Sequence, residues 1–384
     1  MIRDLLFHIG DPKTGTSSIQ AALNRGAWRC EAVRLVPQDY VNATPLANAL
    51  KTDAEPAFRE RQFSHIRDWF SGHDGDLGVI SSEYFARRSP PALRRALEEY
   101  FPDQAPRTRV LAYVRPHASR LISAYGQRLK TGSFAGPLEK FADYMITVPT
   151  LYYAGRFPQW RETFGEGMTL RPFLRGELRD GDVTSDFFFH ALGTPEFELP
   201  GLEPANESLS VAELAGLRLI QQAFTAAELA DHHKLAVGGA LQRKLGAIAG
   251  RGGEKPALDR ATAIRVLEAY LEDARALDTA FFGRPLMEDE LTRARDTAAP
   301  GAQDFTAGRH FSGRQRKRME KAAARIAELI AAMPKAWRQE YQVSIGQRAA
   351  DAIEDPSFKR RRNAKGVWQA LDELAAILAA PDGG

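Results

Sequence analysis

The chain has 384 residues, of which 44% are hydrophobic and 26% charged, as in ordinary globular proteins with one large domain or two. Its formal net charge of +3 is too small to indicate a nucleic acid or a membrane surface as a partner. The single cysteine, Cys30, excludes an internal disulfide and a cysteine-built metal site. There is no apolar run of about 18 residues and no signal-peptide pattern, so we expect no transmembrane segment and a cytoplasmic protein.

The N-terminal stretch predicts a strand, a tight loop and the start of a helix. An apolar run at 5–9 is typical of a buried strand, and Gly10, Pro12 and Gly15 then favour a turn. A helix-spaced apolar face follows Thr16 and predicts a helix to about residue 27. In this arrangement the loop amides and the helix N-terminus direct free N–H groups at one anion.

The loop differs from an ordinary nucleotide-triphosphate loop. That pattern places a lysine directly before the Ser or Thr at the helix start, and here the place holds Thr16. The only lysine, Lys13, lies inside the short loop, where it adds a positive charge, and Thr16 or Ser17 adds a hydroxyl. The sequence therefore predicts a phosphate site of another kind.

Further strands alternate with helices in the first half of the chain. Strands are predicted at 32–37, 77–80 and 109–114, and helices within 42–74 and over 90–100. The strand at 77–80 runs into Ser81, Ser82 and Glu83. Because ligands of parallel sheets lie beyond the carboxyl ends of the strands, we expect these side chains to face the same crevice as Lys13.

A second polar motif follows the strand at 109–114. Arg115 stands just before a helix whose first turn contains Pro116. Ser119 and Ser123 are four residues apart and share one face of that helix. A guanidinium suits a phosphate because its planar fork forms two hydrogen bonds with it.

Together these motifs resemble those of the sulfotransferases that use PAPS (3′-phosphoadenosine 5′-phosphosulfate), and the bacterial members above all. The resemblance covers about residues 1–205 and implies a P-loop NTPase-like parallel α/β core with helices on both faces. It implies that the loop holds the 5′-phosphosulfate, and that Arg115 and Ser123, followed by Tyr125, hold the 3′-phosphate. The loop residues concerned are Pro12, Lys13, Thr14, Gly15, Thr16 and Ser17.

The resemblance also implies the chemistry. Lys13 would neutralise the phosphate oxygen that departs when the sulfuryl group moves to a hydroxyl or an amine, and no metal is needed. Glu83 is the first candidate for the base, because a glutamate has this role in glycan-acting relatives. Alternatively, Glu83 caps a helix or pairs with Arg87 or Arg88. His8 and His117 are second candidates for the base. His8 is expected to be packed in its strand and His117 to be exposed. The acceptor stays open, and a glycan is one possibility; Tyr152, Tyr153 and Arg156 are candidates for lining its pocket.

The rest of the chain is predicted to be largely helical. We expect helices at 157–164, 182–192, 211–230 and 259–275, a strand at 168–173 and a loop at 248–258. The Asn-x-Ser run at 204–210 either contacts the nucleotide or caps the next helix through Ser208 or Ser210. The predicted domains are an α/β domain at 1–290, a linker at 291–310 and a helical basic extension at 311–384. That extension contains helices at 314–333 and 366–380 and basic clusters at 314–318 and 359–362, which we interpret as solvated faces.

Two other functions are weighed. A P-loop kinase or nucleotide hydrolase would need a lysine at Thr16 and an aspartate for Mg²⁺ after an apolar strand, whereas the strand at 77–80 ends in Ser-Ser-Glu. A non-catalytic binding module on the same fold would use the C-terminal helices to dock a partner.

Overall fold

The structure is a computed structural model that describes residues 2–201, 208–344 and 358–381. The chain forms two compact units. The first unit comprises Met1–Arg120, Pro149–Ala205 and Leu267–Arg293, and the second comprises Leu121–Val148, Asn206–Val266 and Ala294–Gly384. The predicted division at residues 290 and 310 stays a prediction, and the second unit draws on segments from both sides of it.

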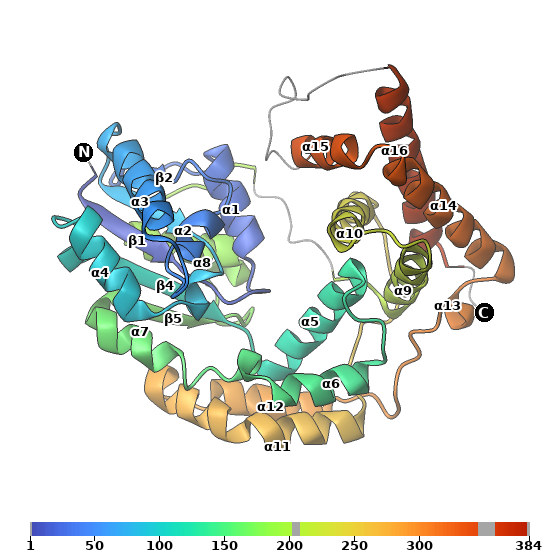
Figure 1. The fold of residues 1–384 in the computed structure, drawn as a ribbon. Helices are drawn as coiled ribbons and strands as arrows, with labels where there is room; N and C mark the ends of the chain where they lie inside the picture. The colour runs from blue at the N-terminus through green and yellow to red at the C-terminus, as the bar shows by residue number, and fades with distance from the viewer. Residues whose placement is uncertain (1, 202–207, 345–357, 382–384) are drawn as a thin grey trace. The chain divides into compact units, whose positions relative to one another are not determined.

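A five-stranded, all-parallel sheet lies at the centre of the first unit (Figure 1). In spatial order its strands are β2 (Leu35–Pro37), β3 (Leu77–Ser81), β1 (Asp4–His8), β4 (Arg109–Val114) and β5 (Met168–Pro172). All five overlap runs that the sequence predicts as strands, so the predicted parallel α/β sheet is confirmed. The chain leaves β1 toward β2 and leaves β4 toward β5, so the carboxyl ends of β1 and β4 flank the point where the winding changes direction.

Helices cover one face of the sheet through a shared apolar cluster. Leu6, Val79 and Leu111 point to this face, since alternate strand residues lie on the same side. They pack with Ile19 of α1 (Thr16–Arg25) and Phe187 of α8 (Val183–Leu192). Each side chain buried in this way contributes about 1.5–3 kcal/mol.

The opposite face is covered by α3 (Pro56–Ser71) and its neighbours. The ring of Phe7 meets Phe85 edge-on, with the centroids 5.4 Å apart. A Cβ at Gly78 would lie 3.1 Å from Cζ of Phe70 and 2.8 Å from a methyl of Leu5. Glycine at this strand position therefore lets α3 approach the sheet closely.

Other helices of the first unit flank these layers. The predicted helices at 90–100 and 157–164 are confirmed, whereas the helix that ends at Asp296 was not predicted. The helices that flank the layers are α2 (Thr44–Asn48), α4 (Pro90–Tyr100), α7 (Phe157–Phe164) and α12 (Leu286–Asp296). Two long helices, α5 (His117–Thr131) and α11 (Arg260–Leu277), begin in one unit and end in the other.

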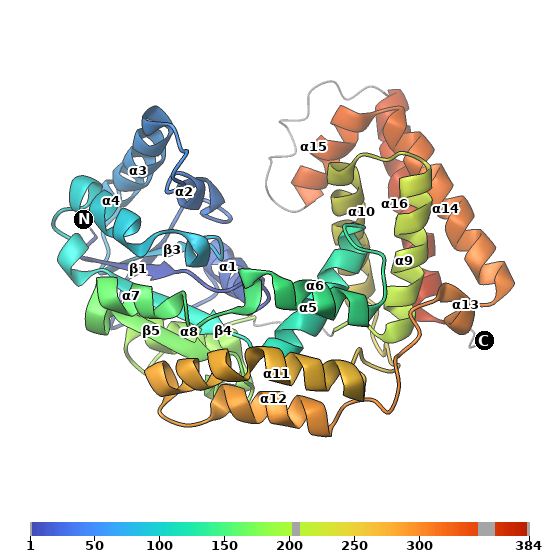
Figure 2. The same ribbon diagram turned by 60° about the horizontal axis from the view of Figure 1, so that its bottom comes forward.

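The second unit is helical in its described residues, with α9, α10, α14 and α16 packed side by side (Figure 2). Its helices are α6 (Leu138–Thr147), α9 (Val211–Ala226), α10 (Asp231–Gly246), α13 (Ala307–His310), α14 (Gly313–Ala331), α15 (Pro334–Ser344) and α16 (Phe358–Ala379). The predicted loop at 248–258 is confirmed. Within the predicted linker lie the end of α12 and the short α13. No helix in the described residues is long and apolar enough to cross a membrane.

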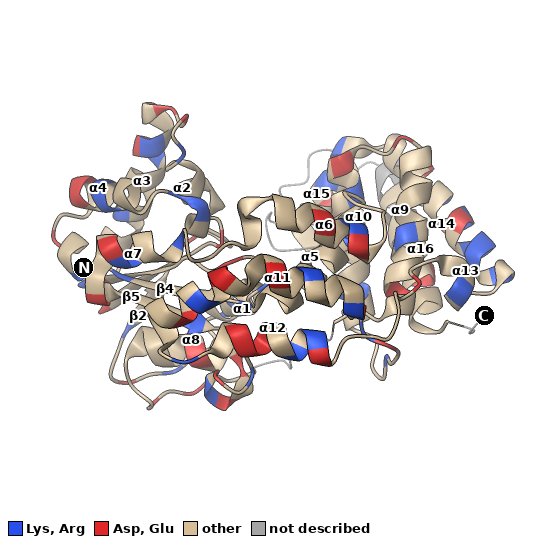
Figure 3. Cartoon of the chain, turned by 90° about the horizontal axis from the view of Figure 1, so that it is seen from below, with Lys and Arg blue, Asp and Glu red and all other residues tan. Residues whose placement is uncertain are grey.

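The start of α9 tests the predicted cap. Ser210 Oγ accepts a hydrogen bond from the Glu213 backbone N–H, and a Glu213 carboxylate oxygen accepts one from the Ser210 N–H, which is a reciprocal capping box. The cap is therefore Ser210 and not Ser208. Residues 204–207 of the Asn-x-Ser run lie outside the described residues. Figure 3 shows the basic segments of α13 and α14, where the predicted cluster at 314–318 begins α14.

Candidate functional site

The loop after β1 is held at the carboxyl end of the sheet and has an unusual backbone. The Ile9 and Asp11 N–H groups continue the pairing to β4, donating to the Leu111 and Tyr113 carbonyls over 2.9 and 3.1 Å. Lys13 then takes a φ of 72°, a left-handed conformation that is rare for a residue with a side chain. Such strain concentrates at functional sites, where the surrounding structure has to maintain it.

The start of α1 presents unsatisfied polar groups beside this loop. The helix is capped by Gly15, at φ 80°, and no side chain caps it. The Ser18 N–H donates to the Gly15 carbonyl over 2.9 Å, so the amides of Thr16 and Ser17 are the ones left for an anion. The Thr16 hydroxyl is buried and has no hydrogen-bond partner. A Cβ at Gly10 would lie 2.9 Å from that hydroxyl oxygen, so glycine keeps the space above it open. Each of these features suits an anion at the loop.

A buried carboxylate organises the cations around the loop. Arg120 Nε donates to Asp11 Oδ2 over 3.0 Å, with both side chains almost fully buried. Arg156 Nη2 lies 3.0 Å from Asp11 Oδ1. The Nε atom of Arg156 is buried without a hydrogen-bond partner, so this guanidinium keeps donor capacity. Burial lowers the pKa of the Arg87 guanidinium. The negative charge of Asp11 raises this pKa, and the positive charges of Arg156 and Arg120 lower it further.

Lys13 belongs to the same electrostatic group. Burial lowers its pKa to about 8, with the positive charges of Arg120 and Arg115 acting in the same direction and Glu83 opposing them. The ammonium is still mostly protonated at neutral pH. Five cations (Lys13, Arg87, Arg115, Arg120 and Arg156) thus share this region with the carboxylates of Asp11 and Glu83. The excess of three positive charges favours a multiply charged anion.

Arg115 connects the two predicted motifs. Its Nη1 donates to the carbonyl oxygen of Lys13 over 3.4 Å, so the guanidinium touches the loop itself. Its Nε donates to Ser119 Oγ over 3.2 Å, and its guanidinium carbon lies 5.6 Å from the centroid of the Phe173 ring. Ser123 is half-buried one turn after Ser119 on α5, and its predicted role beside Arg115 stays a prediction.

The first candidate base, Glu83, is held by an amide network. Asn42 Nδ2 donates to Glu83 Oε2 over 3.0 Å and to Gln20 Oε1 over 3.2 Å. Gln20 in turn donates to the carbonyl oxygen of Ser81, at the end of β3, over 3.3 Å. The alternative interpretation of Glu83 as the partner of an arginine is not needed to explain its position. Its influence on the pKa of Lys13 places its charge within electrostatic range of the loop.

The two histidine candidates are both buried. His8 is packed in β1 as predicted, where its Nδ1 lies 2.9 Å from Ser81 Oγ and burial lowers its pKa to about 3. The expectation that His117 is exposed is wrong. Its Nε2 lies 2.9 Å from an Asp273 carboxylate oxygen, and its ring contacts the rings of Tyr153 and Tyr270. Asp273 also accepts hydrogen bonds from the Tyr153 and Ala154 N–H groups, which indicates a structural role.

The remaining predicted loop residues differ in what they offer. Thr14 is buried, and its hydroxyl donates to the Asp11 carbonyl over 2.6 Å, so this hydroxyl stabilises the loop. Pro12 is half-buried and Ser17 is exposed. A Cβ at Gly15 would lie 2.5 Å from a Val183 methyl, which explains the glycine.

Sequence reasoning missed the roles of Asp11, Arg120 and Arg87, and it named Arg156 only as a candidate for the acceptor pocket. A charged residue directly after a buried strand was a usable signal for Asp11. No local signal points to its partners, because Arg120 lies 109 residues further along the chain.

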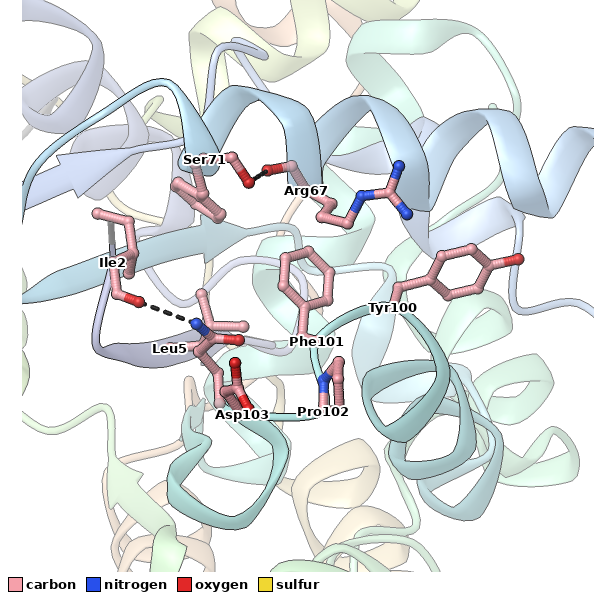
Figure 4. Close-up of a pocket in the computed structure, with 10 residues that line it drawn as sticks. Ile2, Leu5, Arg67, Ser71, Tyr100, Phe101, Pro102 and Asp103 are labelled. Carbon is pink, nitrogen blue, oxygen red and sulfur yellow. Dashed lines mark hydrogen bonds between the residues drawn. The ribbon is translucent and has the colours of Figure 1, made fainter.

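A separate cavity at the amino edge of the sheet is not part of this site (Figure 4). It has a volume of about 180 Å³, and Ile2, Leu5 and Phe101 lie along it. Its polar groups serve the fold: Gln104 donates to the Ile2 carbonyl over 2.9 Å, and Arg67 pairs with Asp68 over 3.0 Å. Ligands of parallel sheets bind at the other edge.

Comparison with known proteins adds no assignment. No protein-family model matches the chain, and no curated protein matches it significantly. Within the described residues, no group of three or more His, Cys, Asp or Glu side chains is arranged to hold a metal ion.

Proposed function

We propose that the chain is a PAPS-dependent sulfotransferase built on a P-loop NTPase-like core. The observation that carries this proposal is the contact between Arg115 and the carbonyl of Lys13. It brings the two motifs that resemble the family's donor-binding motifs to one cationic region, at the edge of the sheet where nucleotides bind. A donor phosphorylated at both its 5′ and 3′ positions needs cations at two neighbouring points.

The 5′ end of the donor is assigned to the loop. Lys13, the open amides at the start of α1 and the unpartnered Thr16 hydroxyl supply a charge and several donors to one phosphosulfate. The 3′-phosphate is assigned to Arg115, with Ser123 as its second ligand. Burial and the positive charge of Arg120 lower the pKa of the Arg115 guanidinium. An anion bound beside Arg115 offsets this repulsion.

The transfer proceeds in line. The bond between sulfur and the 5′-phosphate oxygen breaks while a bond forms between sulfur and the acceptor oxygen or nitrogen. Lys13 stabilises the negative charge that develops on the departing phosphate oxygen. Glu83 accepts the acceptor's proton, and the hydrogen bond from Asn42 holds one carboxylate oxygen so that the other remains available.

A thermal-shift comparison tests this proposal against the kinase alternative. We expect adenosine 3′,5′-bisphosphate at micromolar concentration to raise the melting temperature without magnesium, and ATP with Mg²⁺ to raise it much less. The reverse ranking would reject the sulfotransferase and favour a P-loop kinase. Strong bisphosphate binding without turnover toward any hydroxyl or amine acceptor would favour a non-catalytic binding module.

A further inference from the structure

The second unit contains a cavity that the proposed transferase chemistry does not use. It has a volume of about 380 Å³, which is within the range of small-molecule sites. It lies among the turn between α9 and α10, the end of α14 and the start of α15. Its apolar lining includes Leu229, Ile330 and Pro334, of which the first two are buried and so form its floor.

Positive groups gather at the mouth of this cavity. Lys335 and Arg338, both exposed on the first turns of α15, line it together with His232 at the start of α10. The N-termini of two helices therefore meet here. The cap residue of α10, Ala230, offers no side-chain hydrogen bond. The His233 N–H donates to the Ala230 carbonyl, so the amides of Asp231 and His232 are the ones left for an anion.

His233 supplies an independent sign of a ligand. Its side chain is 5% exposed, and its Nδ1 is buried without a hydrogen-bond partner although the residue lines the cavity. Burial, followed by the charges of His232 and Arg338, lowers its pKa to about 4. His233 is therefore neutral at physiological pH, and this residue of the cavity lining keeps one buried ring nitrogen without a hydrogen-bond partner. A buried polar atom of this kind usually has a partner.

Glu228 lines the cavity and has an unfavourable backbone conformation. It takes a φ of 54° at the end of α9, where glycine is the usual residue. The Leu229 N–H donates to the Phe224 carbonyl and the Glu228 N–H to the Thr225 carbonyl, which completes a Schellman motif. The Glu228 carboxylate offsets one of the two positive charges of Lys335 and Arg338, so the lining keeps a net positive charge.

We propose that this cavity binds a small organic anion with an apolar body. The anionic group lies at the mouth, against Arg338, Lys335 and the start of α10, and the apolar body covers Ile330 and Leu229. Glu228 opposes the anion's charge and so limits its affinity. This site is distinct from the proposed sulfuryl-transfer site, and its existence does not depend on the proposed function.

Isothermal titration of the full chain with octanoate tests the site. We expect saturable binding of one octanoate per chain, much weaker binding of acetate, which lacks the apolar body, and of octan-1-ol, which lacks the charge. Arg338→Gln should weaken octanoate binding about fivefold to tenfold, since it removes a charge-assisted hydrogen bond. Arg325→Gln removes the same charge at an exposed position of α14 outside the cavity lining, and it should leave octanoate binding unchanged.

Two further variants fix the location. Glu228→Gln should tighten octanoate binding about twofold by removing a like charge. Ala331→Trp, at an exposed position of the lining, should abolish binding by filling the space. Equal binding of octanoate and octan-1-ol, equal losses in Arg338→Gln and Arg325→Gln, or full binding by Ala331→Trp would each overturn the proposal. Adenosine 3′,5′-bisphosphate affinity should be the same in all four variants.

Discussion

Arg120 and Asp11 form a buried ion pair, with Nε and Oδ2 3.0 Å apart, at the start of the loop that contains Lys13. The pair joins the first turns of α5 to the end of β1, and Arg156 lies against the other carboxylate oxygen. Asp11, Arg120 and Arg156 therefore form a group of charges, here called the support, that holds the loop in place. Because the support carries more positive than negative charge, it holds the loop's shape and attracts an anion at the same time.

Asp11→Asn tests this support. We expect the free energy of unfolding to fall by about 3–5 kcal/mol, because the change leaves the buried Arg120 charge without its partner. Chemical denaturation measures it, with the exposed Asp53→Asn as the matched control. Adding Arg120→Gln to Asp11→Asn should restore part of the loss. If Asp11→Asn costs no more than Asp53→Asn, the ion pair does not stabilise the loop.

The lowered pKa of Lys13 predicts how nucleotide binding depends on pH. Below about pH 8 the lysine carries its charge and attracts the phosphates; above it the free protein has to take up a proton before binding. The affinity for adenosine 3′,5′-bisphosphate should therefore fall about tenfold per pH unit above 8 until the pKa of the complex is reached. Phosphate itself titrates near pH 6, so calorimetric titrations from pH 7 to 10 isolate the lysine. Lys13→Arg should remove the dependence, and an unchanged pH profile in that variant would assign it to another group.

Arg115→Ala should discriminate between nucleotides that differ in one phosphate. We expect affinity for adenosine 3′,5′-bisphosphate to fall about 10–100-fold and affinity for adenosine 5′-monophosphate to change little, because Arg115 is assigned to the 3′-phosphate alone. Arg95→Ala, an exposed arginine on α4, is the control. Equal losses for the two nucleotides would show that Arg115 does not contact that phosphate.

Glu83→Gln separates catalysis from binding. Turnover, measured as bisphosphate released from PAPS over a panel of hydroxyl and amine acceptors, should fall about 10²–10⁴-fold. Affinity for the bisphosphate should be kept, since the amide preserves shape and removes only a negative charge. Glu166→Gln at an exposed position should behave as the wild type. Unchanged turnover in Glu83→Gln would mean that another group takes the proton.

The sheet was predictable from the sequence and the support of the site was not. Apolar runs such as 5–9 and 109–114 are local signals, and they gave the strands and the loops that follow. Asp11 and Arg120 are paired by tertiary folding over 109 residues, which no local pattern records. The same limit explains the error at His117: a polar residue at a helix start suggests exposure, but Asp273, 156 residues away, covers it.

The two motifs in the sequence named Lys13 and Arg115 as candidate site residues but did not predict the contact between them. That Arg115 contacts the Lys13 carbonyl follows from the adjacency of β1 and β4, which sequence order alone does not determine. Similarly, the helix predicted over 211–230 is interrupted because Glu228 adopts a left-handed backbone, a conformation that its residue type does not favour.

A structure of the chain with adenosine 3′,5′-bisphosphate bound tests the central claim most directly. The account predicts the 5′-phosphate on the loop at 10–16, within hydrogen-bond distance of the Lys13 ammonium, and the 3′-phosphate against the Arg115 guanidinium. A bisphosphate bound with either phosphate away from its assigned group, or bound at another edge of the sheet, would contradict it.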